Sequence, residues 1–154
     1  MDEQKLPTGF ERGTDGPKVI VTGVDGSDTS WRAAAYAAGL ARRQNALLAI
    51  VYVQPYTPTG AALGVPVVEA TTGIAEQLMA EIRESVERLR GIFEVRWEFH
   101  TFRGDPYNGL AAAADELKAD AVVVGASERA GHRLVGSVAV RLVKAGKWPV
   151  TVVP

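Results

Sequence analysis

The C-terminal stretch of the chain constrains the fold more than any other part of it. An apolar run, Ala121–Val124, stops at Gly125, and a loop of small and basic residues follows. Gly136 and Ser137 then open a helical pattern, and a second apolar run, Val150–Val153, comes after that helix. Strand, glycine-rich loop, helix and strand make one βαβ unit, whose loop leads into a helix N-terminus. Because the first N–H groups of a helix have no intrahelical partner and carry a partial positive charge, phosphate is the natural ligand there.

Composition is typical of a globular protein, and it excludes several classes. The chain has 154 residues, enough for one domain with a substantial core, of which 47% are hydrophobic and 23% charged. Its 17 basic and 18 acidic residues argue against a protein that mainly coats nucleic acid or an anionic membrane. It has no cysteine, which excludes disulfides, thiol nucleophiles and cysteine-ligated metals. No apolar run spans a bilayer and the N-terminus is unlike a signal peptide, so we expect a cytoplasmic protein with no membrane partner.

Strand-like and helix-like patterns alternate over residues 18–154, after a leader, residues 1–17, that we expect to be disordered. The strands are expected at Lys18–Val24, Ala46–Val53, Glu94–Phe102, Ala121–Val124 and Val150–Val153. The helices are expected at Ser30–Arg43, Ile74–Gly91, Pro106–Lys118 and from Gly136 onward. This alternation predicts a single doubly wound, Rossmann-like α/β domain with a five-stranded parallel sheet and right-handed crossovers.

The segment Gln54–Gly73 gives no regular pattern, because proline, glycine and threonine are scattered through it. Such a long connection is unusual inside a compact domain. Its apolar residues are too many for a loop in water, so we predict a lid over the crevice that covers the base end of the ligand. The alternative is that they pad the dimer interface or a neighbouring helix.

Five motifs resemble those of the universal stress protein family. They are VTGVDGSDTS at the end of the first strand, the turn GDP, the fourth strand DAVVVGAS, the helix start GSVAVRLV and the last strand PVTVV. Together they extend the resemblance over Lys18–Pro154. The resemblance implies the strand order 3-2-1-4-5 and a homodimer formed through the last strand. One branch of the family binds ATP with the pattern Gly-x-x-Gly, nine residues, Gly-Ser/Thr, whereas another branch lacks the pattern and binds none.

The match to that pattern is partial. Gly125 fits the first glycine, Gly136-Ser137 fits the closing pair, and Asp25 fits the acidic residue at the adenosine end. Position 128, however, is Glu128 instead of the second glycine, and the loop is two positions short. The resemblance and the carboxyl ends of the strands give the candidate nucleotide-binding residues, which are Val24, Asp25, Gly26, Val53, Gly104, Gly125, Ser127, Arg129, Gly136, Ser137 and Val138.

The leading functional hypothesis is a stress-response protein that binds an adenine nucleotide, ATP (with Mg²⁺) or AMP or cyclic AMP, between the first and fourth strands. The alternative is a nucleotide-free homodimeric scaffold, which the short loop and Glu128 favour. A weak nucleotide hydrolase ranks third, since neither a catalytic base nor a metal-ligand cluster is evident. Helix capping alone would also explain Asp25 and Ser27.

Overall fold

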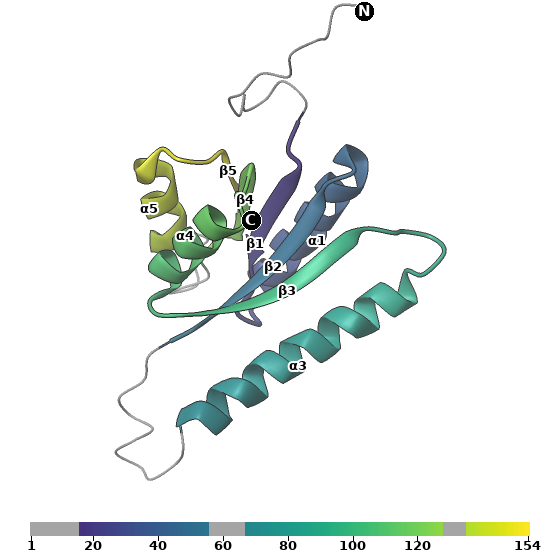
Figure 1. The fold of residues 1–154 in the computed structure, drawn as a ribbon, viewed down its shortest axis with the longest axis horizontal. Helices are drawn as coiled ribbons and strands as arrows, with labels where there is room; N and C mark the ends of the chain where they lie inside the picture. The colour runs from purple at the N-terminus through teal and green to yellow at the C-terminus, as the bar shows by residue number, and fades with distance from the viewer. Residues whose placement is uncertain (1–15, 56–66, 128–134) are drawn as a thin grey trace, which may run out of the picture.

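One parallel sheet organises the molecule (Figure 1). The computed structural model describes residues 16–55, 67–127 and 135–154. The strands of the sheet are β1 (Val19–Gly23), β2 (Leu47–Gln54), β3 (Arg96–Arg103), β4 (Ala121–Gly125) and β5 (Val150–Val153). They lie in the order β3-β2-β1-β4-β5, and every neighbouring pair is parallel. The predicted doubly wound sheet and its order are therefore confirmed.

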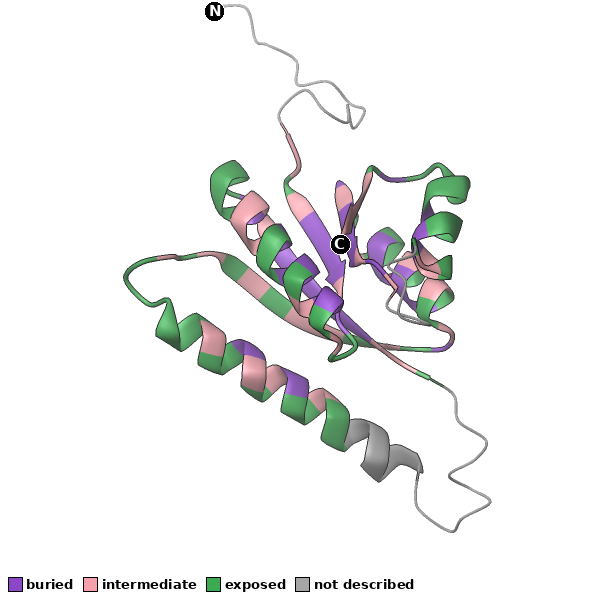
Figure 2. Cartoon of the chain, turned by 180° about the vertical axis from the view of Figure 1, so that it is seen from behind, coloured by how far each residue is buried: buried purple, intermediate pink, exposed green. Residues whose placement is uncertain are grey.

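Helices cover both faces of the sheet (Figure 1). They are α1 (Asp28–Gln44), α3 (Val67–Arg88), α4 (Pro106–Glu116) and α5 (Ser137–Ala145). One apolar cluster joins α1 and α3 to the sheet through residues such as Ile20 and Ile50, and a second joins α4 and α5 through residues such as Val21 and Val51. Figure 2 shows the buried residues concentrated in the central strands and on the sheet-facing side of α1. None of the helices in the described part of the chain is long and apolar enough to cross a membrane.

The first helix begins and ends where its sequence directs. The Ser27 side chain accepts a hydrogen bond from the backbone N–H of Ser30 at 3.3 Å, which caps the helix. At the other end Asn45 takes a left-handed conformation, with φ 52°, which is a common helix stop. Alanines on the inner side let this helix lie close to the strands, and Ala33, Ala37 and Ala41 are fully buried.

The segment Gln54–Gly73 is the first place where the sequence prediction was wrong. Helix α3 begins at Val67, so the last third of that segment is helical. The last proline of the segment is Pro66, and a helix can start without interruption directly after it. The β-branched residues that follow lower helix propensity only slightly. Residues 56–66, on which the lid hypothesis mainly rests, lie outside the described residues.

The apolar stripe predicted for this helix is buried only in its middle. Leu78 and Ile82 are 3% and 5% exposed, whereas Ile74, Val86 and Leu89 are 45%, 37% and 42% exposed. The helix also ends at Arg88 rather than at the expected glycine. Strand β3 starts two residues later than predicted because its pairing with β2 sets its beginning, with Leu47 opposite Arg96. Its place at the edge of the sheet was predicted correctly.

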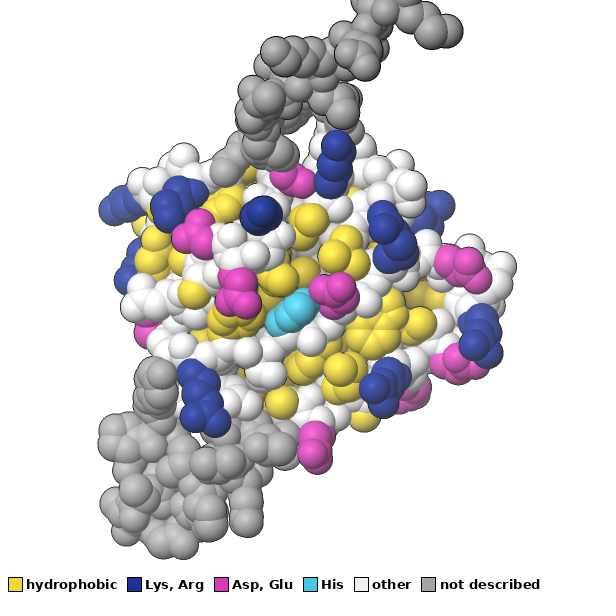
Figure 3. All heavy atoms as spheres, in the orientation of Figure 1, with side chains coloured by type: hydrophobic (Ala, Val, Ile, Leu, Met, Phe, Trp, Pro, Cys, Tyr) yellow, Lys and Arg dark blue, Asp and Glu magenta, His cyan; other side chains and the backbone are white. Residues whose placement is uncertain are grey.

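Charges of both signs are interspersed on the face seen in Figure 3, where exposed hydrophobic side chains lie among them. That mixture agrees with the formal net charge of −1.

Candidate functional site

The turn between β1 and α1 is held by a small hydrogen-bond network. Asp25 Oδ1 accepts the N–H of Ser27 at 2.9 Å, and the Asp25 N–H donates to Ser30 Oγ at 3.3 Å. Ser30 Oγ in turn donates to the Ser27 carbonyl at 2.9 Å. Gly26 has φ +88°, a conformation that strongly favours glycine. Just before the turn, Val24 donates its N–H to the Val51 carbonyl at 2.9 Å, which fixes the turn to the sheet.

These contacts keep the Asp25 side chain charged. Burial by itself raises the pKa of this carboxyl, but hydrogen bonds from Ser27 and Ser30 together lower it more, so the pKa lies below the ordinary value of 3.8. Asp25 is therefore an acceptor-only carboxylate near neutral pH, suited to the hydroxyl or amino donors of a ligand. Although the turn covers part of this side chain, enough of the residue is exposed to leave it accessible to a ligand.

Tyr52, on the neighbouring strand β2, is a residue that sequence reasoning missed. It is 5% exposed, and burial raises the pKa of its hydroxyl, with the negative charge of Asp25 raising it further. A tyrosine within an apolar strand looks like an ordinary core residue in the sequence. That Tyr52 lies near Asp25 becomes apparent only when the parallel pairing of β1 and β2 is known.

The end of strand β4 packs tightly on the same turn. A methyl group on Gly125 would lie 2.6 Å from the carbonyl carbon and oxygen of Thr29, and 2.9 Å from the Ser30 nitrogen. Only glycine allows this approach of strand to helix. Just beyond it, the Ala126 N–H donates to the Val153 carbonyl of β5 at 2.8 Å.

Helix α5 starts beside the end of β4. A methyl group on Gly136 would lie 3.2 Å from the Ser127 side chain, so the helix N-terminus and the strand end are neighbours. No side-chain hydrogen bond from the described residues caps α5 at Gly136, whereas Ser27 caps α1 and Asp105 caps α4. Gly136 itself has no side chain with which to cap the helix, so the first backbone N–H groups of α5 form its positive end without a cap from that residue.

An arginine joins α5 to α4. Arg141 Nη1 lies 3.1 Å from Asp105 Oδ1, and its guanidinium lies 4.0 Å from the centroid of the Tyr107 ring. Asp105 also caps α4 by accepting from the N–H groups of Tyr107 and Asn108, each at 3.1 Å. The pair therefore ties the N-terminus of α4 to the middle of α5 on one face of the sheet.

The structure brings together most, but not all, of the predicted site residues. Gly125 packs against the turn that follows Asp25, and Gly136 lies beside Ser127. Val53 instead faces Gly109 of α4. Gly104 donates to the Gln54 carbonyl at 3.0 Å, after edge strand β3, with β2 and β1 between it and β4.

Three further observations complete the site. Val138 is half-buried against the apolar cluster on the α4–α5 face. Arg129 and Glu128 lie outside the described residues. Among those that are described, no group of three or more His, Cys, Asp or Glu residues could hold a metal ion.

Comparison with known proteins identifies the family. The sequence profile of the universal stress protein family matches residues 17–154. The chain belongs to the universal stress protein family. A universal stress protein of Methanocaldococcus jannaschii is 34% identical over 142 residues, which cover 88% of this chain and 81% of that relative.

Solved structures support the same assignment. A universal stress protein UspA from Lactobacillus plantarum is 23% identical with a TM-score of 0.74, and the match covers 89% of this chain and 97% of the other. That likeness concerns the fold. A universal stress protein solved in complex with cAMP is 26% identical with a TM-score of 0.66, covering 90% and 97% of the two chains.

Proposed function

We propose that this universal stress protein is a cytoplasmic, non-enzymatic stress-response protein that binds an adenine nucleotide in the crevice between β1 and β4. The observation that carries the proposal is the juxtaposition of three segments where the strand order reverses. These are the charged turn at Asp25, the β4 end at Gly125 and the uncapped start of α5. Ligands of doubly wound sheets bind at this reversal.

Each segment has a chemical role in the proposal. The Asp25 carboxylate accepts hydrogen bonds from the adenosine end of the ligand. The first N–H groups of α5 and the Ser137 hydroxyl hold its phosphate. ATP would arrive with its own Mg²⁺, and a monophosphate or cyclic AMP suits a shortened loop. The related structure with cAMP supports the adenine nucleotide class.

Calorimetric titration of ATP, ADP, AMP and cyclic AMP tests the proposal. We expect Asp25→Asn to weaken the binding of every nucleotide bound by the unchanged protein by about tenfold or more, because hydrogen bonds to charged groups contribute roughly 1.5–3 kcal/mol. Asp28→Asn is the matched control, since it makes the same chemical change in the first turn of α1. It should leave affinity unchanged.

The second candidate is a nucleotide-free homodimeric scaffold, favoured by the short loop and by Glu128. No binding heat from any of the four nucleotides would contradict the nucleotide proposal and leave the scaffold. Equal losses of nucleotide affinity in Asp25→Asn and Asp28→Asn would show that Asp25 is not part of the binding site. Release of phosphate during the titration would contradict the non-enzymatic part of the proposal.

A further inference from the structure

Helix α3 packs on the sheet through its middle and leaves a groove between its C-terminal part and α1. In its described part the helix buries Leu78 and Ile82, and Figure 2 shows that most of its other surface is exposed or half-buried. The groove has a volume of about 860 Å³, within the range of roughly 300–1,000 Å³ typical of small-molecule sites. None of the crevice residues lines it.

The groove is lined mainly by apolar side chains. Leu48, Ile50 and Trp97 of the sheet contribute to its lining, together with Val86 of α3 and Leu89, which directly follows that helix. On the α1 side the lining residues are mostly alanines, whose small side chains leave the space open. The charged residues that line the groove are four arginines and four glutamates, so the lining has no excess of positive charge to hold a nucleoside triphosphate. The lining therefore favours an apolar chain.

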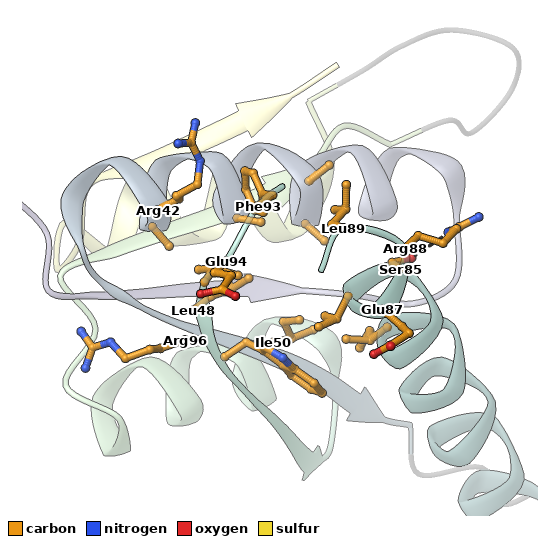
Figure 4. Close-up of a pocket in the computed structure, with 18 of the residues that line it drawn as sticks. Arg42, Leu48, Ile50, Ser85, Glu87, Arg88, Leu89, Phe93, Glu94 and Arg96 are labelled. Carbon is orange, nitrogen blue, oxygen red and sulfur yellow. Dashed lines mark hydrogen bonds between the residues drawn. The ribbon is translucent and has the colours of Figure 1, made fainter. Parts of the chain in front are cut away.

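One cation in the lining has free hydrogen-bond donors. The Arg42 guanidinium lies 4.9 Å from the centroid of the Phe93 ring (Figure 4), and no hydrogen bond or ion pair involves it within the described residues. A guanidinium with free donors matches a carboxylate.

The other arginines of the lining have partners. Arg88 lies 4.0 Å from Glu84, and Arg90 lies 3.3 Å from Glu87. Arg96 donates to the Asn45 carbonyl at 2.8 Å. Arg42 is thus the lining arginine for which the described residues provide no hydrogen-bond or ion-pair partner.

An acidic neighbour limits the charge of such a ligand. Glu94 also lines the groove, is exposed and forms no ion pair with the described residues. Its carboxylate would repel a doubly charged phosphate head more strongly than a singly charged one. One negative charge therefore suits this end of the groove better than two.

We propose that the groove between α1 and α3 binds an unbranched monocarboxylate amphiphile, of the medium- to long-chain fatty acid class. The carboxylate pairs with Arg42, and the chain lies along Leu48, Ile50 and Trp97. This site is separate from the nucleotide crevice and does not depend on the proposed function.

Tryptophan fluorescence tests the position of the chain. Trp31 and Trp97 line the groove, while Trp148 is buried in the apolar cluster on the opposite face of the sheet. A Trp148→Phe variant with an unchanged circular dichroism spectrum reports on the groove alone. Dodecanoate brominated on its chain should quench the tryptophan fluorescence of this variant. Unbrominated dodecanoate is the control and should not quench it. Absence of quenching would overturn the proposal.

Calorimetry of the full chain below the micelle concentration tests the head group and the chain. Affinity should rise about fourfold for each methylene from decanoate to dodecanoate. Dodecanoate should bind about threefold to fivefold more tightly than dodecanol, since a solvent-exposed ion pair contributes up to about that factor. Arg42→Gln should abolish this preference. Arg43→Gln removes a neighbouring arginine that does not line the groove, so it should keep the preference.

Three results would overturn the proposal. They are no binding of dodecanoate, equal affinity for dodecanol in the unchanged protein, or the same effect of Arg42→Gln and Arg43→Gln. Self-association that protects α1 and α3 from hydrogen exchange, without dodecanoate binding, would assign the groove to a second copy of this chain.

Discussion

At the scale of single residues, Gly125 determines how closely the two halves of the crevice approach each other. The atoms that a side chain would meet there belong to the backbone of Thr29 and Ser30, at 2.6 to 2.9 Å. Backbone atoms in the capped first turn of a helix cannot rotate away as a flexible side chain can. A larger residue must therefore push β4 and α1 apart.

We predict that Gly125→Ala lowers the free energy of unfolding by about 1–3 kcal/mol, the usual cost of overpacking. The control is Gly39→Ala in α1, where a methyl group would meet nothing within 4 Å. That change should stabilise the protein by about 0.5–1 kcal/mol, because alanine favours a helix. Urea unfolding of both variants measures the difference. Equal stability of Gly125→Ala and the unchanged protein would contradict the close approach.

At the scale of elements, the structure gives Asp105 two tasks. It caps α4 through two backbone N–H groups, and it pairs with Arg141 of α5 at 3.1 Å. Asp115, near the other end of α4, makes a similar exposed pair with Lys147, also at 3.1 Å, but caps no helix. The two aspartates therefore separate the contribution of the cap from that of the ion pair.

We predict that Asp105→Ala lowers the free energy of unfolding by about 0.5–2 kcal/mol through loss of the helix cap. Loss of the ion pair with Arg141 adds about 0–1 kcal/mol. Asp115→Ala should lower the free energy of unfolding only by the contribution of its ion pair, about 0–1 kcal/mol. Asp105→Ser keeps a capping side chain and should recover most of the difference. Thermal and urea unfolding of the three variants are the measurements. A loss in Asp115→Ala as large as that in Asp105→Ala would show that the cap is not the main contribution.

The caps also show how far the sequence could predict the elements. Ser27 and Asp105-Pro106 have chemistry that acts locally, so a reader of the sequence can place the starts of α1 and α4 within a residue or two. The exposed side chains of Val86 and Leu89 could not be predicted, because helical periodicity says which residues share a side and not how closely that side packs. In the candidate site, too, local features could be predicted and those that depend on tertiary structure could not. The turn at Asp25 and the end of β4 are predictable from strand ends, whereas Tyr52 required the register of β2.

At the scale of the whole molecule, the outer edge of β5 carries backbone groups that need hydrogen-bond partners. The carbonyls of Pro149 and Val153 accept hydrogen bonds from Val122 and Ala126 on the β4 side, each at 2.8 to 2.9 Å. Because alternate residues of a strand direct their backbone groups to opposite sides, Val150 and Val152 direct theirs to the other edge. No described strand pairs with that edge.

Apolar residues surround this edge. The side chains of β5 are all half-buried, and on α5 Val140 and Val143 are 37% and 59% exposed. An unpaired apolar edge favours association with another chain. Antiparallel pairing of β5 with its copy about a twofold axis would use the same backbone groups in both chains. We therefore propose a homodimer formed through β5, as the family resemblance also implies.

We predict that Val152→Pro shifts this dimer toward monomer, with the dissociation constant rising about fivefold or more. Proline removes one outward N–H from each copy, and the two lost hydrogen bonds together contribute about 1–3 kcal/mol. The bonds to β4 use the inward groups of Pro149 and Val153, and edge strands tolerate proline, so the fold should persist.

Val152→Ala is the matched control, because it trims the side chain but keeps the N–H. Sedimentation velocity over a range of concentrations measures all three proteins, and circular dichroism checks their fold. If Val152→Pro dimerises as tightly as Val152→Ala, the interface does not use the backbone of β5. If the unchanged protein is a monomer at the highest concentration, this dimer does not form.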